Sequence, residues 1–584
     1  MKTLYRSSLG FIGALALAGT AYAQAPSTND TSDAYRNTGM GSGALVKVTP
    51  GIFPTGYDNT ASGFDALGSN TTGYFNTASG YGALNDNTSG SYNTASGYAA
   101  LAQNTTGSYN AASGVFALYF NTTGYYNTAA GSNALYSNKG SGNTAVGYDA
   151  LLENVNAVGN TAVGYLALQS NSGDNAGANT AFGSFVLQSN TTGYYNTASG
   201  YEALVHNTTG YYNTASGYEA LYSNTTGNSN TASGKQALYS NESGGTNTAY
   251  GYGALYSNTG GSNNTAAGSN ALFSNTGSDN TATGSNALNQ NTSGGFNTAS
   301  GVNALYYNTT GQWNTSSGVY ALYRNTTGQQ NTASGGQALY DNTTGELNTA
   351  AGTNALYSNT GGSNNTASGW DALFSNTTGI NNIAVGFEAG YYLTTGSNNI
   401  DIGNLGLAAE SNTIRIGHTS TQKATYIAGI YGTSVSGSAV MISSTGQLGA
   451  VVSSERFKTA IAPMGSNSAR LHKLRPVTFH LKTDPKGALQ YGLIAEEVAR
   501  VYPELVIRNE TGRIDGVRYD ELAPMLLNEV QQQQQKMAAQ AAEIRRLKQQ
   551  QKQLVTHAEL NNLKQELQAA LAKLQSKDEL VPQR

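Results

Sequence analysis

The sequence predicts a mainly β protein: a parallel β-solenoid or β-roll of about 22 coils, a small α+β domain and a C-terminal coiled-coil helix. Three observations support this fold class. Asparagine, glycine and threonine recur with a period of 17 residues through most of the chain. Glycines and short polar runs interrupt every repeat. An ordinary globular composition, rich in charge, begins only after Gln447.

The repeats align on the asparagine of "NTASG" and its variants, from Asn59 to Asn399. The step is 17 residues, with occasional steps of 16 and one of 19, and a typical unit is "NTASGYEALVHNTTGYY" at 196–212. Degenerate copies at Asn37 and Asn412 predict terminal coils. A short fixed period is typical of stacked units that bury a face only against their neighbours.

Strands fit each repeat better than helices. A glycine five residues into the unit and "NTTG" near its end leave no room for a helix of two turns. The alternation in "NTASG", and in "NIAVG" at Asn382 and "NIDIG" at Asn399, predicts a short strand whose first and third residues share one face. We interpret the recurrent Ala-Leu pair as a second strand, and we expect stacked Asn and Tyr ladders between coils.

The apolar content of each repeat is small. Ordering 17 residues costs roughly 17 to 34 kcal/mol of backbone entropy, whereas burying one leucine returns about 1.5 to 3 kcal/mol. We therefore expect a homotrimer, with three chains packed around an axis. Near-identical repeats also specify register poorly, because a slip of one coil loses only the end contacts. A separate element must set the register.

The N-terminus has the order of a secretory signal peptide. Residues 1–23 contain Lys2 and Arg6, then a short apolar stretch, then small residues up to Ala23. We expect cleavage near Ala23 and a short segment with a cap coil at 24–58. No later stretch is apolar enough for a membrane span, and the absence of cysteine excludes a disulfide framework. These features predict a secreted or cell-surface protein.

Charge divides the chain. Residues 453–584 hold 20 of the 29 Lys+Arg and 15 of the 33 Asp+Glu, which leaves 9 basic and 18 acidic residues for the first 452. The repeat solenoid, 59–417, and a β-rich connector, 418–452, are therefore almost uncharged. Such a surface argues against a nucleic-acid partner and suits glycans or other neutral surfaces. The scattered histidines offer no metal-ligand spacing, so we expect no metal and no cofactor.

The C-terminal segments predict alternating strands and helices. "LHKLRPVTFHL" (471–481) predicts a helical turn and a strand, and "YGLIAEEVARVYPELV" (491–506) predicts a strand and a short helix. "GVRYDELAPMLLNEV" (516–530) predicts a strand that leads into a long helix. Beyond it, apolar residues at spacings of three, four and seven predict a coiled-coil tail at 531–584.

These segments, in this order after "SSERFKTAI", resemble the intramolecular-chaperone auto-processing domain first known from phage endosialidase tailspikes (peptidase family S seventy-four). The resemblance covers about 453–550 and is carried by "SSERFK", "LRPVTF", "GLIAEEV", "YPELV" and "VRYDELAPMLL". It implies a domain, 453–530, that trimerises, guides a β-rich fibre into register and then cuts itself off with a serine–lysine dyad.

By position, the resemblance implies that Ser453 is the nucleophile, that Lys458 is the base and that the cut falls between Val452 and Ser453. Ser454 stands where the family usually has an acidic residue. A serine hydroxyl needs a nearby base, and a lysine serves as one only when desolvation lowers its pKa. The apolar neighbours Val451, Val452, Phe457 and Ile461 would provide that setting once chains associate.

Other chemistry-bearing residues are interpreted structurally. We interpret Glu496 and Glu497 as a surface pair on a helix, and His480 as a packing or hydrogen-bonding residue of a strand. Trp313 and Trp370 replace residues of single coils, and we interpret them as surface decoration rather than as a sugar-binding platform.

The repeats resemble the head repeats of trimeric autotransporter adhesins, whose strands read like "SVAIG". The predicted function is a secreted trimeric fibrous surface protein, adhesin-like or structural, whose C-terminal chaperone drives trimerisation and register and then cleaves itself off. One alternative is a polysaccharide-acting tailspike-like enzyme, although no recurring insertion carries paired carboxylates. The other is an ice-binding solenoid with regular rows of threonine.

Overall fold

The computed structural model describes residues 31–33, 35–47, 56–418, 420–428, 440–443, 445–450, 452–509 and 511–576. The chain divides into two compact units, the first ending at Tyr426 and the second beginning at Ile427. The predicted signal peptide lies outside the described residues.

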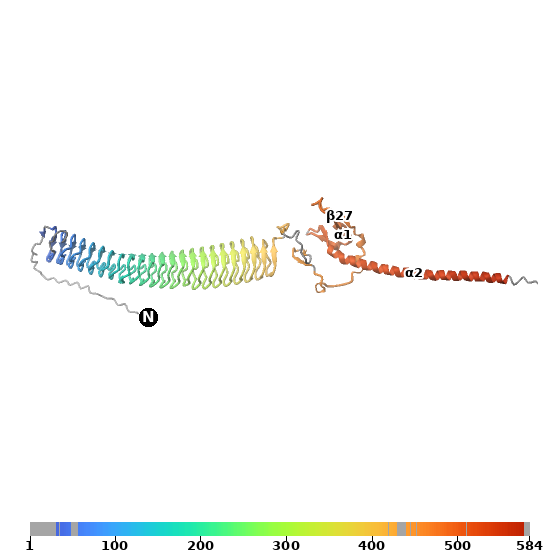
Figure 1. Ribbon diagram of the computed structural model, residues 1–584, viewed down its shortest axis with the longest axis horizontal. Coiled ribbons are helices and arrows are strands. Elements are labelled where there is room, and N and C mark those ends of the chain that lie inside the picture. Colours follow the sequence, from blue (N-terminus) through green and yellow to red (C-terminus); the bar gives the residue numbers. More distant parts are fainter. Residues whose placement is uncertain are drawn as a thin grey trace, which may run out of the picture. The chain divides into compact units, whose positions relative to one another are not determined.

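The first unit is a parallel β-solenoid of about 21 turns with one three-residue strand in each regular coil (Figure 1). Its strands are β1 (Thr31–Ser32), β2 (Thr38–Met40), β3 (Thr60–Ser62), β4 (Thr77–Ser79), β5 (Thr94–Ser96), β6 (Ala111–Ser113), β7 (Thr128–Ala130), β8 (Thr144–Val146), β9 (Thr161–Val163), β10 (Thr180–Phe182), β11 (Thr197–Ser199), β12 (Thr214–Ser216), β13 (Thr231–Ser233), β14 (Thr248–Tyr250), β15 (Thr265–Ala267), β16 (Thr281–Thr283), β17 (Thr298–Ser300), β18 (Thr315–Ser317), β19 (Thr332–Ser334), β20 (Thr349–Ala351), β21 (Thr366–Ser368), β22 (Ile383–Val385), β23 (Ile400–Ile402) and β24 (Ile414–Ile416).

Equivalent residues of adjacent coils face each other in this sheet. Thr197 of β11 lies opposite Thr214 of β12, one repeat later, and the same register holds along the array. The degenerate copies form the terminal coils, because β2 pairs with β3 and β24 pairs with β23. At the first edge, β1 pairs antiparallel with β2. The solenoid predicted from the repeat period is thus confirmed.

The Ala-Leu pair does not form a second strand, so that interpretation was wrong. In the coil at 196–212, Glu202 and Leu204 have positive φ values of 55° and 52°, flanking Ala203. This left-handed conformation is incompatible with a strand and turns the chain tightly. The amide of Leu204 nevertheless donates to the carbonyl oxygen of Ala220 in the next coil, at 3.0 Å. A short coil must reverse the direction of its backbone within a few residues, and two straight strands would not allow this.

Each coil closes its own apolar interior within one chain. In the coil at 196–212, Ala198, Ala203 and Leu204 are fully buried. The flanking strand residues Thr197 and Ser199 are exposed, so the first and third strand positions share the outer face, as predicted. Because these small residues fill the interior of a single chain, the coil core does not depend on a second chain.

Two buried asparagine ladders complete the interior, as predicted. Asn207 Nδ2 donates to Oδ1 of Asn190 in the preceding coil at 2.8 Å and to the carbonyl of Gly210 at 3.0 Å. In the second ladder, the amide of Asn213 donates to Asn196 Oδ1 at 3.0 Å. Buried polar groups stabilise a fold only when they are hydrogen-bonded. The ladders therefore add stabilisation that apolar burial alone does not supply.

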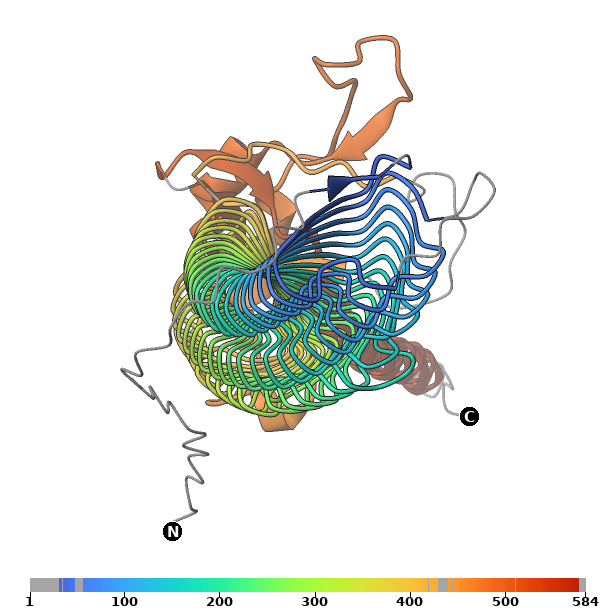
Figure 2. The same cartoon turned by 90° about the vertical axis from the view of Figure 1, so that its left-hand side faces the viewer.

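Aromatic ladders run along the outside. Tyr222 stacks on Tyr239 and Tyr239 on Tyr256, each with ring centroids 4.9 Å apart, and Phe273 continues the row at 4.8 Å. Viewed along the array, successive coils rotate gradually (Figure 2), so these rows wind around the solenoid. The predicted tyrosine ladders are confirmed.

The second unit contains three β-hairpins and two α-helices. The predicted order of elements at 471–481, 491–506 and 516–530 is confirmed. The elements are β25 (Val440–Ile442), β26 (Leu448–Ala450), β27 (Val477–Phe479), β28 (Gln490–Gly492), β29 (Val506–Arg508) and β30 (Ile514–Val517), with the 3-10 turns η1 (Glu455–Phe457), η2 (Gly465–Ser468), η3 (Leu471–Lys473) and η4 (Pro503–Leu505), and the helices α1 (Ala495–Val501) and α2 (Tyr519–Gln575).

Tyr502 is the centre of a small core in this unit. Its ring is fully buried among residues of α1, β29 and β30 and beside Met525 of α2. Its hydroxyl donates to the carbonyl of Asn467 at 3.0 Å and accepts from the amide of Arg470 at 3.1 Å. Only the start of α2 packs here. The rest of this continuous helix is exposed, and no helix in the described residues is long and apolar enough to span a membrane.

Candidate functional site

The tight turn η1 brings Ser453 and Lys458 together. The amide of Phe457 donates to the carbonyl of Ser454 at 3.0 Å, and that of Lys458 donates to the carbonyl of Glu455 at 2.9 Å. The chain therefore bends between the two side chains, and Lys458 Nζ donates to Ser453 Oγ at 3.1 Å.

This distance is within the reach of proton transfer. A positioned base must lie within about 2.6 to 3.2 Å of the group whose proton it removes. When the amine of Lys458 is neutral, the direction of the bond reverses, and the hydroxyl of Ser453 donates to the nitrogen. The pair has the contact that a serine nucleophile and a lysine base require.

The pair is open to solvent in the single chain. Ser453 and Lys458 are both exposed, and so are the apolar side chains around them, with Val452 62%, Phe457 56% and Ile461 63% exposed. Val451, also expected in this setting, lies outside the described residues. One chain thus leaves the apolar neighbours of the pair available for burial by another surface.

The other charged candidates of this unit have partners of their own. Arg475 forms an ion pair with Glu497 at 2.6 Å, and this guanidinium lowers the pKa of the carboxyl below its usual value. His480 Nδ1 lies 3.0 Å from the carbonyl oxygen of Gly487. Glu496 lies beside Glu497 in the first turn of α1. These contacts fit the structural interpretations of Glu497 and His480.

The two tryptophans belong to the aromatic rows of the solenoid. Trp313 stacks on Phe296 with centroids 4.2 Å apart, and Trp370 stacks on Phe387 at 5.0 Å. Both indoles remain about half exposed. Each therefore extends a row of the repeat.

The structure contains a buried, unpaired carboxylate that the sequence analysis did not predict. Asp401 of β23 occupies the inward position that alanine fills in other coils, is 1% exposed and has no hydrogen-bond partner on either oxygen. Burial raises its pKa to about 6, and the nearby Glu410 acts in the same direction. Arg415 lies one coil further, but its guanidinium binds Glu410 at 2.8 Å. The alternation in "NIDIG" was the signal that could have located this residue.

Metal chemistry has no counterpart in the described part of the chain, where no group of three or more His, Asp or Glu side chains is placed to hold an ion. Comparison with the curated proteins gives no match. The comparison with family models gives a match in the second unit. Residues 453–507, which begin at the Ser453–Lys458 pair and stop short of "VRYDELAPMLL", match the family described as chaperone of endosialidase.

Proposed function

We propose that the protein is a secreted trimeric fibre whose C-terminal module acts as an intramolecular chaperone and then detaches by cleavage between Val452 and Ser453. The observation that carries this proposal is the 3.1 Å contact between Lys458 Nζ and Ser453 Oγ, located at the first residue of the match to the chaperone family. The 21-turn rod is the product that such a module would assemble.

The proposed cleavage requires only residues of this chain and one water molecule. Neutral Lys458 takes the hydroxyl proton of Ser453, and Oγ attacks the carbonyl carbon of Val452. The C–N bond breaks and the proton passes to the new amino group of Ser453. Water then hydrolyses the resulting ester, which leaves the carboxylate of Val452 and restores the hydroxyl of Ser453.

Association would switch this chemistry on. A lysine becomes a better base where burial disfavours its charged form. In the single chain the apolar neighbours Val452, Phe457 and Ile461 are exposed. Packing of these side chains against partner chains would exclude water from the pair, so cutting would follow assembly and release the module only from a finished fibre.

Exposed apolar surface supports a trimer. Tyr491 of β28 is 78% exposed, and Leu489 beside it is half exposed. Along α2 the apolar side chains face solvent at the spacings of a coiled coil. Members of this row include Leu527, Val530, Met537, Ile544, Leu547, Leu560, Leu563, Leu567 and Leu574.

Intact-mass measurement of the mature chain and its variants tests the proposal. The wild type and Ser454→Ala should both yield a fragment of residues 453–584. Ser453→Ala and Lys458→Ala should each remain as one uncut species, while Lys482→Ala, which removes a lysine elsewhere in the module, should cut normally. Cutting in Lys458→Ala, or no cutting in the wild-type trimer, would remove the processing step.

A further inference from the structure

Four consecutive coils carry a side chain larger than serine at one surface position of the repeat, where the flanking coils have serine. In these coils the second residue after the buried leucine is Gln290, Tyr307, Arg324 and Asp341. In the coils on either side of this run the same position is a small serine: Ser223, Ser240, Ser257 and Ser274 before it, and Ser358 and Ser375 after it.

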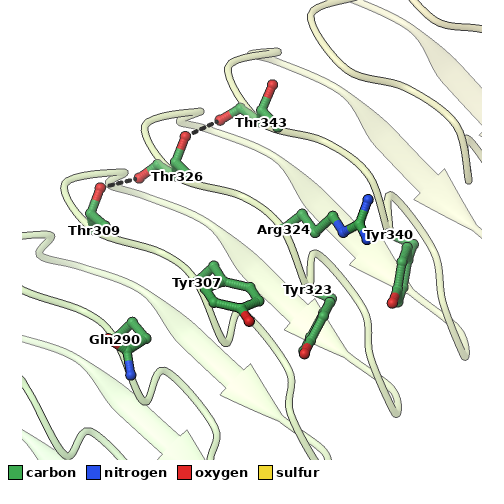
Figure 3. Close-up of a pocket in the computed structure, with 8 residues that line it drawn as sticks. All are labelled: Gln290, Tyr307, Thr309, Tyr323, Arg324, Thr326, Tyr340 and Thr343. Carbon is green, nitrogen blue, oxygen red and sulfur yellow. Dashed lines mark hydrogen bonds between the residues drawn. The ribbon is translucent and has the colours of Figure 1, made fainter.

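Three of these larger side chains, Gln290, Tyr307 and Arg324, line a surface groove of ≈620 Å³ (Figure 3). Tyr323 and Tyr340 line one side. Thr309, Thr326 and Thr343 line the other, and the hydroxyls of Thr309 and Thr326 each donate to the carbonyl of the next threonine at 2.9 and 3.0 Å. Their donor capacity is therefore used, whereas the oxygen lone pairs can still accept hydrogen bonds from a ligand.

Tyr307 differs from the other rings of the groove. Tyr323 and Tyr340 stack at 5.2 Å, and Tyr340 stacks on Tyr357 at 5.0 Å, so neighbours cover their faces. Tyr307 lies at 76° to Tyr306 and at 73° to Tyr323, is 44% exposed, and in Figure 3 is turned across the other two rings. An open aromatic face attracts the weakly positive edge of a ligand, such as the C–H groups of a sugar ring.

The groove carries no net charge. Arg324 Nη1 donates to Asp341 Oδ1 at 2.9 Å, and the two charges cancel. Burial, together with a hydrogen bond to Tyr307, raises the pKa of Tyr323 to about 12, so its hydroxyl stays neutral. A guanidinium has five N–H groups, so Arg324 keeps donors for a ligand. Gln290 Nε2 uses one of its two hydrogens on the neighbouring Asn289 Oδ1 at 2.8 Å.

The backbone along the groove is already paired between coils. The amide of Thr309 donates to the carbonyl of Thr326, and that of Thr326 donates to Thr343. A peptide that binds as an added strand needs unpaired backbone groups at a sheet edge. Recognition in this groove must therefore use side chains.

We propose that this groove binds a neutral oligosaccharide, with one sugar ring against the face of Tyr307 and its hydroxyls accepting hydrogen bonds from Arg324 and Gln290. Threonine oxygens on the opposite side accept hydrogen bonds from the sugar. This site goes beyond the proposed chaperone function and does not depend on cleavage, because every lining residue belongs to the solenoid.

Binding to the mature full-length chain is measured with fluorescently labelled hexasaccharides. The neutral probes are cellohexaose and maltohexaose, the acidic probe is hexagalacturonate, and a flexible hexapeptide represents protein ligands. Tyr307→Ser and Arg324→Ser restore the residue of flanking coils, so both variants should keep the fold, as circular dichroism checks. Tyr392→Ser is the matched control, because Tyr392 has the same repeat position outside the groove.

We expect a neutral probe to bind, and to bind about tenfold more weakly to Tyr307→Ser, with unchanged binding to Tyr392→Ser. Equal binding by folded Tyr307→Ser, preference for the acidic probe or the peptide, or no binding of either neutral probe would overturn the proposal. Lys458→Ala should bind like the wild type, which separates this result from a failure of the processing step.

Discussion

Asp401 shows how one residue can oppose the pattern of the repeat. Alanine at the inward strand position is buried without cost, as Ala384 of the preceding coil is. Asp401 instead places a carboxylate in the same interior without a hydrogen bond, while the nearest cation, Arg415, is engaged by Glu410. An uncompensated buried charge destabilises a fold. The ionised carboxylate of Asp401 therefore destabilises this end of the solenoid.

The stability of this end should depend on pH. The pKa of Asp401 is raised to about 6 from an unfolded value near 3.8, so the folded state holds the proton more tightly. The contribution of Asp401 to stability is then greatest below pH 4. It is lost as the pH rises from 4 through 6, by about 2 to 3 kcal/mol. Asp401→Ala should abolish this loss. Hydrogen exchange of amides 399–417, corrected for intrinsic rates, measures it, and an identical pH dependence in the variant would contradict the assignment.

The coil is the element that the glycine after each strand makes possible. Gly217 has a φ of 138°, and a Cβ on it would collide with the backbone of Gly234 in the next coil. The equivalent glycines of the other coils stack in the same way. Non-glycine residues at the later turns have φ values of 50° to 61°, in the left-handed helical region that L residues can adopt. Close backbone approach and a φ that L residues rarely adopt together explain why this position is glycine.

Two glycine substitutions test this explanation. Gly217→Ala should lower the free energy of unfolding by at least ~2 kcal/mol, because it combines backbone strain with a clash. Gly336→Ala is the control, because the nearest non-adjacent atom to its new Cβ would be the carbonyl oxygen of Val319, at 3.9 Å, and its φ is not positive. It should be neutral or stabilise by up to about 1 kcal/mol. Urea unfolding followed by circular dichroism compares them, and equal effects would refute the steric explanation.

At the scale of the whole molecule, the two units differ in how much of their apolar surface a single chain buries. The solenoid buries its alanines, leucines and asparagines within one chain. Its nearly identical coils would specify the register between neighbouring rods poorly. The second unit is the reverse, with a small core and much exposed apolar surface. We infer that this unit associates the chains and sets the register of their repeats.

Removal of the second unit tests the inference that this unit aligns the chains. Chains that end at Val452 should fold coils but fail to give one uniform trimer, because nothing aligns the rods. Full-length Lys458→Ala is the control, since it keeps the module attached and should assemble normally. Light scattering after size-exclusion chromatography gives the masses. Uniform trimers from the truncated chain would show that the solenoid sets its own register.

Much of the fold could be predicted from the repeat pattern of the sequence. The repeat period gave the stacked coils, their terminal copies and the asparagine and tyrosine ladders, because equivalent residues must meet when units of fixed length stack. The Ala-Leu segment was misassigned, because left-handed turns by non-glycine residues leave little local signal. The Ser453–Lys458 pair was named from position and resemblance, and its catalytic role stays a prediction.

The sequence by itself determined the repeat, its strand and the order of elements in the C-terminal module, since these depend on local spacing and composition. Only the tertiary structure decided which side chains meet across coils. It placed Tyr307, Arg324 and Thr326 around one groove, left Asp401 without a hydrogen-bond partner, and closed the core within one chain. Those outcomes depend on how far each coil turns before it stacks on the next, and no single repeat contains that information.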